Sequence, residues 1–243
     1  MRIPAVAPPL DDVSRLCRAA DERLWVAWSN AKNQSYSPDR TQIVYPSYGR
    51  NGGIRASEQE ARLAFIESLI GESSHLFSIE TPTNELYSFS GNQAVSAQTD
   101  LALHNDGGGI DLRVEFKAKG YSPDRQDKHP IFKDMQKLLR EKAPGLWFHV
   151  LENVDLTTID KLLAVLTEGI ASAVDQHSIQ NNQLGIHVCI LYSKSYGTGF
   201  SVEQWHTVEP DNLRTLQFSP KPGWMPKSGD VIGEWHINCP SSK

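Results

Sequence analysis

The sequence has few cysteines and no long hydrophobic run. Its three cysteines, Cys17, Cys189 and Cys239, lie far apart and cannot all pair. They fit a reducing compartment better than a disulfide framework, and their positions show no zinc-type spacing. No apolar stretch approaches the roughly 20 residues that a membrane-spanning helix needs. Prolines stand near the N-terminus where a secretory signal would have an apolar helix. We therefore expect a cytoplasmic protein with no membrane partner.

The sequence also lacks the excess of positive charge that is typical of proteins that coat nucleic acid. The formal net charge is −5 at pH 7, which argues against binding by bulk attraction. One local exception is the segment 113–142, where nine lysines and arginines stand against five acidic residues. The composition is 39% hydrophobic and 22% charged, as in ordinary globular proteins. An enzyme with a local basic groove beside an acidic site remains compatible with these numbers.

Hydrophobic periodicity predicts most of the secondary structure. Apolar residues at helical spacing predict helices over about 10–28, 57–70, 131–142 and 159–170. The second of these helices begins with Ser57 and Glu60, which have the spacing of a capping box. Short apolar or alternating stretches predict two strands around a Pro-Thr-Asn turn, then a hairpin and two buried strands, over 75–81, 85–91, 96–120, 146–154 and 184–193.

The order of these elements predicts an α/β protein with a mixed sheet. An antiparallel hairpin followed by helical crossovers implies a sheet that contains both strand directions, with helices on its faces. We divide the chain into an N-terminal helix and polar loop (1–55), a core (56–194) and an irregular C-terminal cover rich in Trp, Gly and Pro (195–243).

The hairpin over 96–120 carries charged side chains on one face and apolar side chains on the other. If Gly107 and Gly108 are the central residues of the turn, the numbers of paired residues sum to 215. Asp100 then lies directly across from Glu115. Opposed residues have Cβ atoms roughly 4.5–5.5 Å apart, so these carboxylates repel each other unless a positive charge lies between them.

Two carboxylates held this close suit a hard cation. Oxygen ligands favour Mg²⁺ or Mn²⁺, and such an ion can bind phosphate oxygens and lower the pKa of a bound water. Lys117, two residues after Glu115, points to the same face, where an ammonium would orient that water or offset charge on a phosphate. The alternative is that this face is simply the solvated side of an ordinary hairpin.

The short motifs on this hairpin resemble those of the PD-(D/E)xK nuclease superfamily, which includes many restriction endonucleases. The residues concerned are "TD" at 99–100 and "EFK" at 115–117, with Thr99 in place of the proline that gives the family its name. The family core is a helix, three strands, a helix and a strand, and residues 57–151 follow that order. The resemblance implies a restriction-endonuclease-like core, α-βββ-α-β, extended here by a further helix and strand.

The resemblance also implies site residues and a reaction. Asp100 and Glu115 would bind a divalent metal, Mg²⁺ or Mn²⁺, with the carbonyl of Phe116 as a further ligand. Lys117 would assist the attacking water. The family often adds a carboxylate from the first helix, and Glu60 is the candidate, although it also completes the capping box. The implied activity is endonucleolytic hydrolysis of nucleic acid, with DNA as the expected substrate.

The sequence leaves four further points open. Glu67 is a second candidate for the additional carboxylate. Lys133, Gln136 and Lys137 on the following helix would contact the phosphate backbone or support the site, or else form a solvated helix face. Many nucleases that cut both strands are homodimers, which makes a homodimer an option here. The competing function is a catalytically inactive nuclease-fold module that binds nucleic acid or a protein partner.

Overall fold

The structure is a computed structural model that describes residues 10–36, 38–48, 53–88, 93–118, 129–176, 179–180, 183–192, 199–207, 227–232 and 235–240. The helices in these ranges are α1 (Leu10–Asn33), α2 (Glu58–Glu72), α3 (His129–Arg140) and α4 (Leu156–Gln176). No described helix is both long and apolar enough to cross a lipid bilayer.

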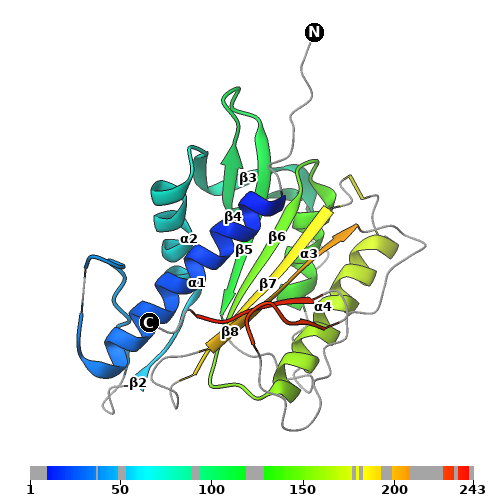
Figure 1. Ribbon diagram of the computed structural model, residues 1–243. Coiled ribbons are helices and arrows are strands. Elements are labelled where there is room, and N and C mark those ends of the chain that lie inside the picture. Colours follow the sequence, from blue (N-terminus) through cyan, green and yellow to red (C-terminus); the bar gives the residue numbers. More distant parts are fainter. Residues whose placement is uncertain are drawn as a thin grey trace.

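An eight-stranded mixed sheet forms the centre of the fold, in the order β3-β4-β5-β6-β7-β8-β10-β9 (Figure 1). Its strands are β3 (Leu76–Tyr87), β4 (Val95–His104), β5 (Ile110–Ala118), β6 (Gly145–Glu152), β7 (Gln183–Leu191), β8 (Gly199–Thr207), β9 (Val231–Ile232) and β10 (Trp235–Asn238). The β5–β6 and β6–β7 pairs are parallel, and the other pairs are antiparallel. A separate small hairpin joins β1 (Ser47–Tyr48) to β2 (Gly53–Ile54). The predicted mixed α/β sheet is confirmed.

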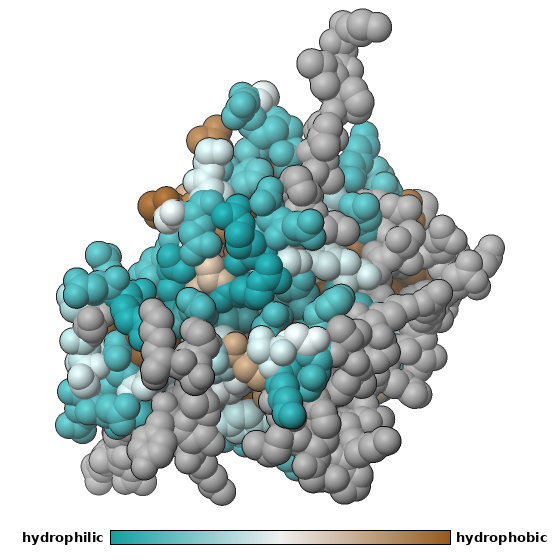
Figure 2. All heavy atoms as spheres, viewed as in Figure 1, coloured by the Kyte–Doolittle hydropathy of each residue, from teal (hydrophilic) through white to brown (hydrophobic). Residues whose placement is uncertain are grey.

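Helices cover both faces of the sheet and create two hydrophobic cores. In Figure 1, α1 crosses one face with α2 beside it, and α3 and α4 lie on the other face. The first core joins α1 and α2 to apolar side chains such as Val114 and Phe116 of β5. The second joins α3 and α4 to side chains such as Trp147 and Ile186. Figure 2 shows that the exposed side of α1 is hydrophilic, as expected for a helix that buries only one face.

The predicted helices are confirmed, including the start of α2. Ser57 is the N-cap of this helix, and its side chain accepts a hydrogen bond from Gln59 N, 3.2 Å away. Glu60 Oε2 accepts one from Ser57 N at 3.0 Å. Together they form the predicted capping box, which satisfies N–H groups that have no partner within the helix.

The two short strands predicted around a Pro-Thr-Asn turn are wrong. Residues 76–87 form one edge strand, β3, whose register against β4 shifts between Pro82 and Leu86. An edge strand tolerates a proline because the missing N–H need not face a neighbouring strand. Residues 199–207, for which the sequence shows no clear period, form β8 beside β7.

The β4–β5 turn differs from the predicted two-residue turn, but the predicted register is right. The turn closes with Asn105 N donating to Gly109 O at 3.0 Å, and Gly108 has φ +75°, a conformation that favours glycine. A register shift beyond the turn places one extra residue in β5. This shift restores the sum of 215, so that Leu101 pairs with Val114.

Candidate active site

The charged face of the β4–β5 hairpin is not a solvated surface, because α3 covers it. Arg113 and Glu115 of β5 are each only 1% exposed. On α3, Asp134 and Lys137 are 5% and 6% exposed, and both contact charged side chains of β5. Burying charges is costly unless they are paired and hydrogen-bonded. The reading of this face as the ordinary wet side of a hairpin is therefore wrong.

Lys137 lies among the carboxylates of this face. Its Nζ is 2.5 Å from Glu115 Oε1 and 2.7 Å from Asp134 Oδ1. It also donates a hydrogen bond to the carbonyl of Gln98 at 2.9 Å. All three of its donors therefore have an acceptor within reach. Lys137 is therefore buried and does not belong to a solvated helix face.

Lys117 contacts the same α3 carboxylate from the other side. Its Nζ is 2.9 Å from Asp134 Oδ2 and 3.9 Å from Glu58 Oε1 at the start of α2. Asp134 therefore bridges the ammonium groups of Lys117 and Lys137. The sequence reasoning missed Asp134, although its i,i+3 spacing to Lys137 places both on one face of the helix.

Asp100 turns toward β5 at the point where the described ladder ends. The last ladder pair on this side is Leu101 with Val114, so Asp100 and Glu115 are the next positions in the same register. Asp100 Oδ2 accepts a hydrogen bond of 2.7 Å from Phe116 N. This contact fixes the Asp100 carboxylate beside the backbone of the "EFK" motif, which is where the sequence predicts it.

The ionisation of Glu115 reflects its burial. Burial raises the pKa of Glu115 well above its ordinary value, and the nearby carboxylate of Asp134 raises it further. The Lys137 ammonium lowers the pKa of Glu115, and Asp100 raises it. Both Glu115 oxygens are inaccessible to solvent. Oε1 faces the Lys137 ammonium at 2.5 Å, and no described residue donates a hydrogen bond to Oε2. Glu115 thus has a close ammonium but unused acceptor capacity.

Burial acts on the pKa values of the two lysines in the opposite direction, but nearby carboxylates outweigh it. Burial lowers the pKa of Lys117, but Asp134, Glu115 and Glu58 outweigh that effect and raise it above its ordinary value. Burial likewise lowers the pKa of Lys137, and the Glu115 and Asp134 carboxylates raise it overall. Both side chains are therefore charged at neutral pH. We call these groups the carboxylate–lysine cluster. It consists of the three carboxylates of Asp100, Glu115 and Asp134 and the two ammonium groups of Lys117 and Lys137.

The two candidates for an additional carboxylate, Glu60 and Glu67, have other hydrogen-bond partners. Glu60 is in the first turn of α2, and its carboxylate accepts a hydrogen bond from Ser57 N in the capping box. Glu67 accepts hydrogen bonds from Thr41 Oγ1 at 3.0 Å and from Gln42 N at 3.1 Å. Among the contacts described, neither carboxylate joins the carboxylate–lysine cluster. Lys133 and Gln136 are partly exposed on α3.

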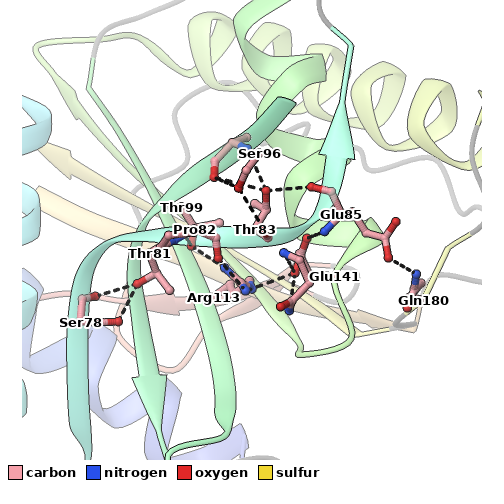
Figure 3. A network of polar contacts seen from close by, with 12 residues as sticks. Ser78, Thr81, Pro82, Thr83, Glu85, Ser96, Thr99, Arg113, Glu141 and Gln180 are labelled. Atoms are coloured by element: carbon pink, nitrogen blue, oxygen red, sulfur yellow. Dashed lines mark hydrogen bonds and ion pairs between the residues drawn. The ribbon is translucent and has the colours of Figure 1, made fainter. Parts of the chain in front are cut away.

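A second buried polar network lies next to the cluster (Figure 3). Glu141, directly after α3, is 3.2 Å from Arg113 Nη2 and accepts hydrogen bonds from Asn84 N at 3.1 Å and Glu85 N at 3.0 Å. Arg113 also donates to Thr99 Oγ1 at 3.0 Å. Unlike Glu115, Glu141 has hydrogen bonds to both oxygens, which is typical of a structural role.

A scan against protein-family models and searches of curated proteins and of solved structures return no match for this chain. Function is therefore inferred from the geometry of the carboxylate–lysine cluster.

Proposed function

We propose that this protein is a metal-dependent nuclease that hydrolyses phosphodiester bonds of nucleic acid, with DNA as the expected substrate. The observation that supports the proposal most is Glu115, a buried carboxylate with unused acceptor capacity, next in register to Asp100 and on the same face as Lys117. This is the arrangement of side chains that the PD-(D/E)xK resemblance implies. The order α2, β3, β4, β5, α3, β6 agrees with the implied core.

The donors present suit a hard divalent cation. Asp100 and Glu115 offer carboxylate oxygens, the ligands that Mg²⁺ and Mn²⁺ prefer, and Phe116 lies between Glu115 and Lys117 with a backbone carbonyl as a further donor. When bound, the ion would supply positive charge beside the scissile phosphate and a water of lowered pKa. The side chains of Asp100 and Glu115 would hold it.

The protein's own residues would position the metal ligands and stabilise charge at the site. The Phe116 N–H holds the Asp100 carboxylate in place. Asp134 holds Lys117, whose ammonium would orient the attacking water or stabilise negative charge on the phosphate. Lys137 would balance the charge of Glu115 while no substrate or ion is present. Preorganised charges of this kind cost little reorganisation during the reaction.

The direct test is cleavage by the purified full-length chain. We expect it to cleave labelled DNA in Mg²⁺ or Mn²⁺ and to leave the same DNA intact in EDTA, with RNA assayed in parallel to establish the substrate. Equal products with and without EDTA would contradict a metal-dependent mechanism. Cleavage of RNA alone would overturn DNA as the substrate and retain the reaction class.

One observation favours the inactive-module alternative. Both lysines of the cluster already have carboxylate partners at 2.5–2.9 Å, so its charges are largely paired without a metal. A protein retained only for binding would bind nucleic acid with no turnover in any divalent cation. Binding that is unchanged by Mg²⁺ and EDTA, without cleavage, would favour this alternative over the nuclease.

A stability measurement tests the metal site without relying on activity. Lys137→Met removes the ammonium between Glu115 and Asp134, which leaves two buried carboxylates short of positive charge. We expect this change to lower the free energy of unfolding in EDTA by about 3–5 kcal/mol. Mg²⁺ should stabilise the variant more than the wild type, because the ion replaces the lost charge and binds only the folded state.

The matched control for this experiment is Lys142→Met, because Lys142 is exposed just beyond α3. The free energy of unfolding of this variant should differ little from that of the wild type. Mg²⁺ should change it by the same amount as in the wild type. If Mg²⁺ stabilises Lys137→Met no more than Lys142→Met, no cation site exists beside Glu115.

A further inference from the structure

A second group of ligand-type side chains lies on the opposite face of the sheet, beneath α1. Cys17 of α1, His187 of β7 and Glu203 of β8 each offer one ligand atom, and these atoms all lie within 4.8 Å of one another. The three residues are 0%, 0% and 5% exposed. We propose that they form a binding site for a transition-metal ion of the zinc class, separate from the carboxylate–lysine cluster.

The spacing of the donor atoms suits such an ion. His187 Nδ1 is 3.2 Å from Glu203 Oε2. In a tetrahedral zinc site with Zn–N and Zn–O distances of about 2.0–2.1 Å, neighbouring ligand atoms lie about 3.3–3.4 Å apart. Without a metal, the same separation is bridged by a hydrogen bond between the imidazole and the carboxylate. Thiolate, imidazole and carboxylate together favour Zn²⁺ over Mg²⁺.

Two of the three ligands are held by partners of their own, as metal ligands usually are. The far nitrogen of His187, Nε2, lies 2.9 Å from Asp21 Oδ2, which orients the ring so that Nδ1 faces the site. Ser14 Oγ donates a hydrogen bond to Glu203 Oε1, which leaves Oε2 directed at His187. Trp205 Nε1 in turn donates to Ser14 Oγ at 3.3 Å.

Cys17 is the ligand that the metal-free network does not use. Its thiol is completely buried, and no hydrogen bond to it is found in the described part of the chain. Cys189, by contrast, has a hydrogen bond with Asp21. A buried thiol facing an imidazole and a carboxylate is inert as a packing group but becomes a strong ligand as a thiolate.

Two carboxylates, those of Asp21 and Glu203, flank the His187 ring. Burial lowers the pKa of His187, but Asp21 and Glu203 outweigh this effect and raise it to about 9. Burial raises the pKa of the Cys17 thiol, as do the charges of Glu203 and Asp21, while Arg18 lowers it.

Co²⁺ is the probe for this site, because a Co²⁺–thiolate bond gives a charge-transfer absorption band. Full-length protein stripped with EDTA and titrated at about pH 8 should develop this band up to one Co²⁺ per chain, and Zn²⁺ should remove it. Cys17→Ser should lose the band. Cys239→Ser, at a half-buried cysteine outside the group, should retain it. Asp100→Asn should also retain it, which separates this site from the nuclease proposal.

Zn²⁺ should also raise the melting temperature of the stripped wild type, a readout that does not depend on the folding of any variant. Ser14→Ala should weaken Zn²⁺ binding by about 10–100-fold, as loss of a ligand's hydrogen-bond partner typically does. Absence of both a stoichiometric band and a thermal shift in the wild type would overturn the proposal. A band that persists in Cys17→Ser would overturn it as well.

Discussion

Asp100→Asn should reduce cleavage of DNA by at least about 10³-fold while leaving the fold intact. Removing one preorganised charge-stabilising group from an active site typically costs about 10²–10³-fold in rate, and this variant also removes a metal ligand. The amide oxygen of asparagine can still accept the hydrogen bond from Phe116 N that Asp100 accepts now. The variant also removes a negative charge that raises the pKa of Glu115.

Lys117→Ala should show a loss of similar size, about 10²–10³-fold, because the ammonium beside the site disappears. The matched control for Asp100→Asn is Asp111→Asn, which makes the same change at a buried aspartate of the same hairpin. Asp111 lies close to the turn, where its Oδ1 accepts a hydrogen bond from Asn105 Nδ2 at 2.8 Å. Cleavage rates at saturating Mg²⁺ and circular dichroism spectra measure both effects. Wild-type rates in Asp100→Asn and Lys117→Ala would assign any activity to another site or to a contaminant.

Glu141→Gln should be among the most destabilising single changes in the protein, lowering the free energy of unfolding by about 3–5 kcal/mol. The change leaves the Arg113 guanidinium, 1% exposed, without its carboxylate partner. It also places an amide NH₂ group where an oxygen now accepts hydrogen bonds from Asn84, Glu85 or Tyr87. Unsatisfied buried donors add to the cost of the lost ion pair.

Glu85→Gln is the matched control for Glu141→Gln, because it makes the same chemical change in the same network (Figure 3). The Glu85 side chain is 36% exposed, and its Oε1 accepts a hydrogen bond from Gln180 Nε2 at 2.6 Å. We expect its free energy of unfolding, measured in urea, to change by no more than about 0.5 kcal/mol. Equal shifts for the two variants would show that Glu141 has no special role in holding the shifted segment of β3.

Features that depend on neighbouring residues were predictable from the sequence. The capping box of Ser57 and Glu60 follows from their spacing. The register of β4 against β5, with Leu101 opposite Val114, follows from a short glycine turn, although the sequence does not show the extra residue beyond that turn. In both cases the physical cause lies within a few residues of the feature itself.

Features that depend on distant parts of the chain were missed. The charged side of β5 was open to interpretation as a solvated face because its partners lie on α3, whose docking the local pattern does not reveal. One signal is visible in retrospect. Arg113 and Glu115 are two residues apart on a strand, about 6.6 Å, and their partners Glu141 and Lys137 are four apart, a helical rise of about 6 Å. Opposite charges at matched spacing indicate that the two segments lie against each other.

The role of α3 in pairing these charges has a consequence for the order of folding. The β4–β5 hairpin closes over a short loop, whereas α3 must dock across a longer stretch of chain, so hairpin closure is the faster event. Before α3 docks on the sheet, the carboxyl groups of Asp100 and Glu115 lie near each other without the ammonium of Lys137. We therefore expect the hairpin without α3 to be less stable at low ionic strength than at high ionic strength, with Lys117 as its own partly compensating ammonium.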